Sequence, residues 1–141
     1  MPVTDVIQAT EAILTETRTR LTEWPGWGVD VFSGTSYDRL FEFIPELLTK
    51  YAGKPCVVVM YSGSDYQNFP RRSMRLAVLI LVENPDSEEG QATVRELLDR
   101  CLSLLDEHIS AHAKWEARTD SAVDFGPNVS CIKADFSVRD H

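Results

Sequence analysis

The sequence predicts a single α+β domain over residues 1–141, in which helices pack against a mostly antiparallel sheet. Two observations carry this prediction. Amphipathic helical patterns alternate along the chain with short apolar or alternating runs that are typical of strands. No repeat, low-complexity tract or linker divides the chain, and its 141 residues, 43% hydrophobic and 26% charged, suit one globular domain. We expect the element order α-β-α-β-β-α-β-β.

The first two elements are a helix and a short strand. Apolar residues recur at helical spacing from about residue 5 to residue 23, and Pro25 with Gly26 should end this helix. Val29 and Val31 then alternate with polar neighbours, which predicts a short strand.

The second helix should begin near Ser36 and end before Gly53, because one face of this stretch is apolar. Pro45 lies inside the pattern. Proline removes a backbone donor and crowds the carbonyl four residues earlier, so we expect the helix to kink or split there.

A hairpin should form the centre of the sheet. Two strongly apolar runs, Val57–Met60 and Leu76–Val82, are separated by a polar loop from Tyr61 to Arg72. Continuous apolar runs rich in β-branched residues suit strands that are buried on both faces.

A long third helix should follow. Asp86 is placed as its N-cap, with Glu89 three residues later, and Glu88 and Glu89 favour the positive end of the helix dipole. Apolar residues repeat at helical spacing from Val94 to Ile109, so we expect the helix to extend that far.

Two strands with one wet face should complete the chain. Trp115, Ala117 and Thr119 alternate with charged residues, and the pattern over 132–139 alternates more regularly. The segment 125–128, Phe-Gly-Pro-Asn, supplies the turn between them.

The composition excludes some functions. A net charge of −8 and a pI near 4.8 argue against a surface that grips nucleic acid, because phosphate binding needs clustered Lys and Arg. No apolar run approaches the roughly 18 residues of a membrane helix, and the N-terminus lacks the pattern of a signal peptide. Three cysteines in predicted elements suit a reducing compartment, so we expect a cytosolic protein without a membrane partner.

No sequence motif identifies a catalytic or metal-binding function. His108 and His112 stand four residues apart in the predicted third helix, a spacing that can place two imidazoles on one metal, but no third ligand is spaced convincingly. Cysteine catalysis would need an exposed thiolate, and each cysteine lies in a predicted buried element. We therefore expect no enzyme, no metal and no cofactor.

The hairpin loop is the best candidate for a contact surface. Tyr61, Asp65, Tyr66, Phe69, Arg71 and Arg72 combine aromatic rings with arginine, a composition enriched at protein interfaces. A solvated loop whose arginines pair with local acids is equally open. Trp24 and Trp27 pose the same question, with core packing favoured.

With these elements in place, the chain resembles the tail terminator family of long-tailed phages and the related Mu-like prophage tail proteins. The resemblance lies in the N-terminal amphipathic helix, the strand entry PCVVVMYSG, the apolar strand RRSMRLAVLILVENP, the helix VRELLDRCLSLLDEHI and the closing alternating hairpin. It covers most of the chain in its order of elements and its pattern of apolar residues, and it rests on no catalytic signature.

The resemblance implies a virion structural protein of the tail or neck, present in the host cytoplasm during assembly. It implies an α+β subunit that forms a hexameric ring, caps the tail tube, stops its polymerisation and joins it to the neck or head-completion protein. DNA would pass through without specific binding, since like charges repel.

A ring built from head-to-tail contacts needs two different complementary surfaces on each subunit. Arg71 and Arg72 could form one surface, and either Glu88 with Glu89 or Asp106 with Glu107 could form the other. Two other functions stay open: a cytosolic module that binds a ligand or peptide, and, less favoured, a metal-dependent enzyme that uses His108 and His112.

Overall fold

The fold is that of a computed structural model, which describes residues 3–24, 26, 28–32, 37–65, 73–110 and 113–140. The predicted element order is confirmed. The helices are α1 (Val3–Thr22), α2 (Tyr37–Lys50) and α3 (Ser87–Leu105), and the strands are β1 (Gly28–Phe32), β2 (Cys56–Asp65), β3 (Ser73–Glu83), β4 (Ala113–Ala122) and β5 (Val129–Asp140).

The five strands form one sheet in the order β1-β2-β3-β5-β4. Strands β1 and β2 run parallel, because α2 connects them and returns the chain to the same end of the sheet. The pairs β2–β3, β3–β5 and β4–β5 are antiparallel. The predicted mostly antiparallel sheet is therefore confirmed.

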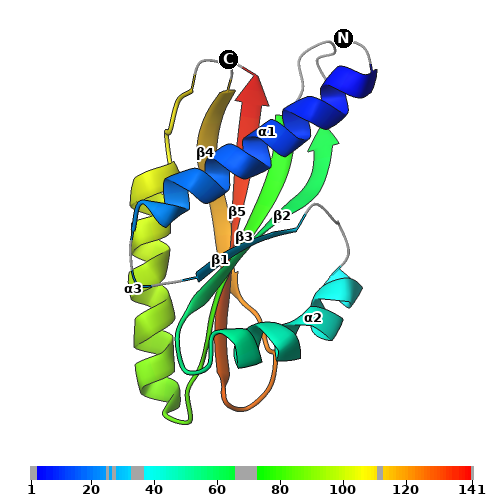
Figure 1. The fold of residues 1–141 in the computed structure, drawn as a ribbon. Coiled ribbons are helices and arrows are strands. Elements are labelled where there is room, and N and C mark those ends of the chain that lie inside the picture. The colour runs from blue at the N-terminus through cyan, green and yellow to red at the C-terminus, as the bar shows by residue number, and fades with distance from the viewer. Residues whose placement is uncertain are drawn as a thin grey trace.

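Helices cover both faces of the sheet (Figure 1). Helices α1 and α3 pack on one face, where Leu14, Leu21 and Leu105 join the larger core. Helix α2 packs on the other face, where Ile44 and Leu47 join a smaller core. We call these the α1/α3 face and the α2 face.

Strand β3 contributes to both cores because successive side chains of a strand point to opposite faces. Its even-numbered residues, such as Leu76 and Ile80, lie in the α1/α3 core, whereas Ala77, Leu79 and Leu81 lie in the α2 core. The exposed fraction of each residue from Leu76 to Val82 is 0–3%. This confirms the expected strand with two buried faces.

Helix α3 begins as predicted but ends earlier. The Asp86 side chain accepts hydrogen bonds from the backbone N–H groups of Glu88 and Glu89, at 3.0 and 3.2 Å. At the other end Asp106 adopts an extended conformation, and Glu107 takes a φ of 61°. The helix therefore stops at Leu105, and the expectation that it reaches Ile109 was wrong.

Helix α2 runs through Pro45 without the predicted split. After the proline the backbone N–H of Tyr51 donates to the Leu47 carbonyl at 2.9 Å, and the Thr49 hydroxyl donates to the Pro45 carbonyl at 2.9 Å. Gly53 follows the helix with a φ of 71°, a left-handed conformation that glycine adopts without steric cost, and this confirms the expected stop.

The last two strands alternate as expected, with one exception in β4. The pairing with β5 shifts between Ala117 and Thr119, so Ala117 lies opposite Phe136 while Thr119 lies opposite Asp135. One extra residue at such a bulge moves the following side chains to the other face. Thr119 is therefore exposed and donates to the Asp135 carboxylate, although the alternation had placed it inward.

The α3–β4 connection covers part of the outer edge of β4. The backbone N–H of Trp115 donates to the carbonyl of His108 at 2.8 Å, and that of Ala117 donates to the Asp106 carboxylate at 2.9 Å. Edge strands otherwise present unpaired donors to solvent. Two outward-facing donors of β4 are thus already occupied.

A buried polar contact ties α1 to β4. The Trp115 indole N–H donates to the hydroxyl of Thr17 at 3.0 Å, and that hydroxyl donates to the carbonyl of Ile13 at 2.7 Å. Both Thr17 and Trp115 are fully buried.

No helix in the described part of the chain is long and apolar enough to cross a membrane.

We predict that Thr17→Val lowers the free energy of unfolding by about 1–3 kcal/mol, because the isosteric side chain leaves the buried indole donor without an acceptor. Thr22→Val is the matched control, since the Thr22 hydroxyl makes a similar bond to the Thr19 carbonyl at an exposed position of the same helix. Urea unfolding of the two variants measures the difference. Equal stabilities would contradict the role assigned to this contact.

Candidate functional site

The predicted contact loop is shorter than its expected range of 61–72, because β2 extends to Asp65 and β3 begins at Ser73. These two residues are paired with each other, so the intervening segment leaves and re-enters the sheet at one place. We call residues 66–72 the tip segment. The tip segment, with its candidates Tyr66, Phe69, Arg71 and Arg72, lies outside the described residues, as does the side chain of Asp65.

Tyr61 lies in β2 and not in the loop. Its half-buried ring packs against the α1/α3 core, and its hydroxyl shares a hydrogen bond of 2.5 Å with that of Ser64. A register shift follows at Ser62, and Gly63 takes a φ of 135°. The Arg75 guanidinium lies so close to Gly63 that a Cβ there would approach it to 2.6 Å. Arg75 is exposed, so the hairpin presents an arginine next to its tip.

The candidate acids Glu88 and Glu89 lie in the first turn of α3, and both are exposed. The neighbouring Asp86 carboxylate is occupied by its capping bonds, and its backbone N–H donates to the side chain of Asn84 at 2.9 Å. This network fixes the start of the helix directly after β3. Glu88 and Glu89 consequently stand at the end of the sheet where β3 terminates.

The acidic end and the hairpin end are separated by the length of β3. From Ser73 to Glu83 the strand makes ten steps of about 3.3 Å, so its ends lie about 33 Å apart. Strand β3 begins at one end of the sheet, directly after the tip segment in sequence, and α3 begins after the other end of the strand (Figure 1). The candidate basic and acidic surfaces therefore belong to opposite ends of one subunit.

An apolar groove lies at the acidic end, on the α2 face. It has a volume of about 640 Å³ and lies between α2, the end of β3 and the β4–β5 connection. Sequence reasoning missed it, because its walls come from three separate stretches of the chain. The lining residues are Ile44, Pro45, Leu48, Thr49, Ala52, Glu83, Phe125, Gly126, Pro127, Asn128 and Val129.

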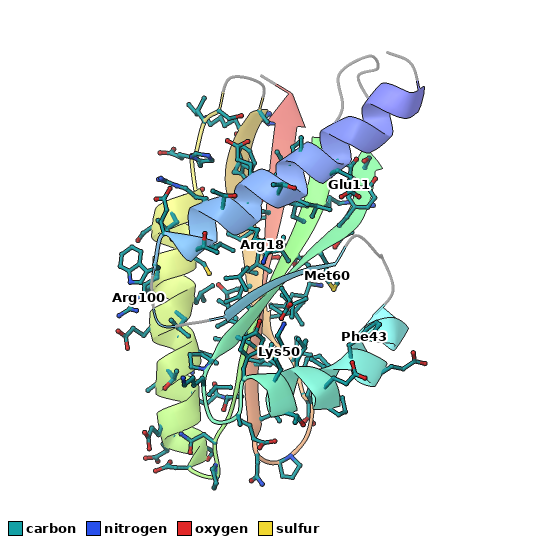
Figure 2. The ribbon with its side chains drawn as sticks, viewed as in Figure 1. Glu11, Arg18, Phe43, Lys50, Met60 and Arg100 are labelled. Atoms are coloured by element: carbon teal, nitrogen blue, oxygen red, sulfur yellow. The ribbon has the colours of Figure 1, made fainter. Side chains whose placement is uncertain are left out.

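A polar contact that the sequence did not reveal joins α2 to β1. The Tyr51 hydroxyl donates to the Asp30 carboxylate at 2.7 Å, and Lys50, labelled in Figure 2, pairs with the same carboxylate at 3.3 Å. Burial, followed by the bond to Asp30, raises the pKa of Tyr51. The ring leaves no room for a side chain at Gly28, where a Cβ would lie 1.9 Å from a ring carbon. This contact locks α2 onto the sheet beside the groove.

The α2 face is charged where it extends over β5 and β4. Glu116 pairs with Arg139, with Arg118 at 3.6 Å and with Lys114 at 3.8 Å. The hydrogen bond from Arg139 holds the pKa of Glu116 below its usual value, despite an opposing desolvation effect. Exposed ion pairs of this kind contribute little stability. In this strip one carboxylate meets three cations, so the solvated face keeps an excess of positive charge.

His108 does not form the predicted helical pair. The helix ends at Leu105, so His108 lies beyond it, and His112 lies outside the described residues. The His108 imidazole is 3.4 Å from the Glu16 carboxylate and packs against Trp115, with ring centroids 4.9 Å apart. Among the described residues, no group of three His, Cys, Asp or Glu side chains could hold a metal ion.

The three cysteines are buried. Burial is the largest cause that raises the pKa of each thiol to about 12, for Cys56, Cys101 and Cys131 alike. A thiol that holds its proton this firmly is a poor nucleophile at neutral pH. The arrangement gives none of them the activated environment that cysteine catalysis requires.

Of the two tryptophans that flank Pro25 and Gly26, Trp24 belongs to the described residues. Trp24 is half-buried and packs against the α1/α3 core, and the Arg100 guanidinium lies 5.3 Å from the centre of its ring (Figure 2). This confirms core packing for Trp24. Trp27 lies outside the described residues.

Comparison with known proteins adds no family to this geometry: no protein-family model and no curated protein matches the sequence.

The buried thiols predict a loss of stability above pH 9. In the unfolded chain thiols ionise near pH 9, whereas the folded protein keeps them protonated up to about pH 12. The folded state then binds more protons, so the free energy of unfolding falls by about 1.4 kcal/mol per pH unit for each thiol.

Chemical unfolding between pH 9 and pH 10, below the ordinary pKa of tyrosine and lysine, measures this slope. Cys101→Ala should reduce the contribution of the thiols to it by about one third, since one of three equivalent groups is removed. An unchanged slope in that variant would contradict the assigned thiol pKa.

Proposed function

We propose that this chain is a structural protein without enzymatic activity, and that identical copies of it assemble into a ring that caps a phage tail tube. In this role it ends polymerisation of the tube protein and joins the tail to the neck or head-completion protein. The ring, expected to be a hexamer, belongs to the virion and forms in the host cytoplasm. DNA passes through it without specific binding.

The observation that carries the proposal is the separation of unlike surfaces at the two ends of β3. Arg71 and Arg72 precede β3 in the sequence, while Glu88 and Glu89 stand exposed shortly after its other end, and the strand between spans about 33 Å. Opposite charges at opposite ends favour head-to-tail contact between copies. Such heterologous contacts produce a closed ring when the rotation between subunits closes.

The other acidic pair is less suited to this contact. The Asp106 carboxylate accepts a hydrogen bond from the backbone of Ala117, so it already serves the edge of β4. Together with Glu107 it follows the C-terminal end of α3, which has run back along the sheet from its start at Ser87. The geometry therefore favours Glu88 and Glu89 as the acidic partners.

A second candidate function is a module that binds a peptide or small ligand. The groove favours it, because its volume of about 640 Å³ is within the range of roughly 300–1,000 Å³ that is typical of ligand sites. Such a module would remain a monomer with the groove occupied by another molecule, so the state of assembly separates the two functions.

Light scattering on the full chain tests the proposal. Six copies of a 15.9-kDa chain give a particle of about 95 kDa. Rings of uniform diameter should be visible by negative-stain electron microscopy. A monomer at every protein concentration would contradict the proposal.

Charge reversal tests whether the arginines of one copy contact the acidic residues of the next copy. Arg71→Glu with Arg72→Glu should weaken assembly because the tip would face the acids of the next copy, and added Glu88→Lys with Glu89→Lys should restore it. Arg18→Glu with Arg95→Glu, at exposed positions of α1 and α3, is the control with the same change in net charge. Circular dichroism checks that the fold is intact. An unchanged mass in the first variant would count against this pairing of surfaces.

A further inference from the structure

We propose that the groove at the acidic end receives the tip segment of a second copy of this chain. The inference rests on the proposed ring and names the contact that builds it. It assigns the groove a definite occupant, residues 66–72 of the neighbouring subunit. Each subunit then contributes its groove to one contact and its tip segment to another.

The groove has the chemistry of a socket for aromatic side chains. Leu48, Phe125 and Val129 are only half-buried, and Ile44 forms the floor. These apolar surfaces gain free energy when a partner removes them from water. Glu83 lines the same groove and is exposed, so the rim carries a negative charge.

The tip segment is complementary in composition. Its sequence, YQNFPRR, combines Tyr66, Phe69 and Pro70 with Arg71 and Arg72. Aromatic side chains and arginine dominate the energetics of protein interfaces, the first as buried anchors and the second through bonds to carboxylates. Rings against the apolar walls would leave a guanidinium for the Glu83 carboxylate.

A subunit cannot fill its own groove. The tip segment has seven residues, and it leaves and returns at the paired residues Asp65 and Ser73. Four extended residues reach at most about 14 Å from that point. Glu83 lies at the far end of β3, about 33 Å away. A tip segment that fills the groove therefore has to come from another copy.

This geometry makes the contact heterologous. Each copy offers its tip segment to one neighbour and its groove to the other, as a closed ring requires. Glu88 and Glu89 lie at the same end as the groove, so they extend the acidic surface that receives the arginines.

Two complementary variants test the inference. The groove variant, Ala52→Arg with Glu83→Lys, changes two exposed lining residues. The tip variant is Phe69→Ala with Arg71→Glu. Each alone should lose assembly by at least about tenfold in affinity, since it lacks one half of every contact. Mixed in equal amounts, they should form a heterodimer of about 32 kDa that grows no further, because only one intact contact remains.

Asp99→Lys with Ser103→Arg is the matched control, with the same change in charge on exposed positions of α3. It should assemble as the unmodified chain does. If the groove variant also keeps the mass of the unmodified ring, the inference is overturned while the ring stands. A monomeric unmodified chain overturns both proposals.

A cross-link identifies the occupant directly. A chain carrying Ala52→Cys should form a disulfide on mild oxidation with a chain carrying Asn68→Cys, because the proposed contact brings the two positions together. The native cysteines are buried and should not compete. Linked dimers support the contact. Absence of linked dimers in mixtures that still assemble, or a link within a single chain that carries both cysteines, would exclude it.

Discussion

The structure depends on the burial of β3. This strand is paired on both edges, with β2 and with β5, and its central residues from Leu76 to Val82 are withdrawn from water on both faces. A strand of this kind requires cover on each side. Helices α1 and α3 supply it on one face and α2 on the other, so the placement of every helix follows from the demands of one strand.

The same strand fixes the relation between the surfaces that we assign to assembly. A fully paired strand bends little, so Ser73 and Glu83, at the two ends of β3, are held at a constant separation. The Tyr51 contact with Asp30 supports this arrangement, since it holds α2, one wall of the groove, against β1.

Much of the fold could be predicted because it is encoded locally. The Asp86 cap, the alternation of β5 and the apolar runs of the hairpin each fall within one short stretch, and the structure confirms them. The end of α3 could not be predicted in this way. Ile109 continues the helical spacing, yet Glu107 adopts a left-handed conformation and the chain leaves the helix.

Features that join distant parts of the chain were beyond the sequence patterns. Thr119 was misplaced because a bulge depends on how β4 pairs with β5, and the groove depends on three stretches that only the folded sheet brings together. The two ends of the hairpin were a different case. Once β3 was predicted as a strand, the distance between its two ends followed from its length.

The covered edge of β4 has a consequence for how copies of this protein can meet. Fibres and amyloid-like aggregates grow when exposed strand edges pair with one another. Asp106 and His108 occupy two of the donors that such growth would use. Sheets from different copies are thereby discouraged from merging at this edge. In the role that we propose, stopping the growth of another polymer, this protection would matter, because the capping protein would not start a polymer of its own.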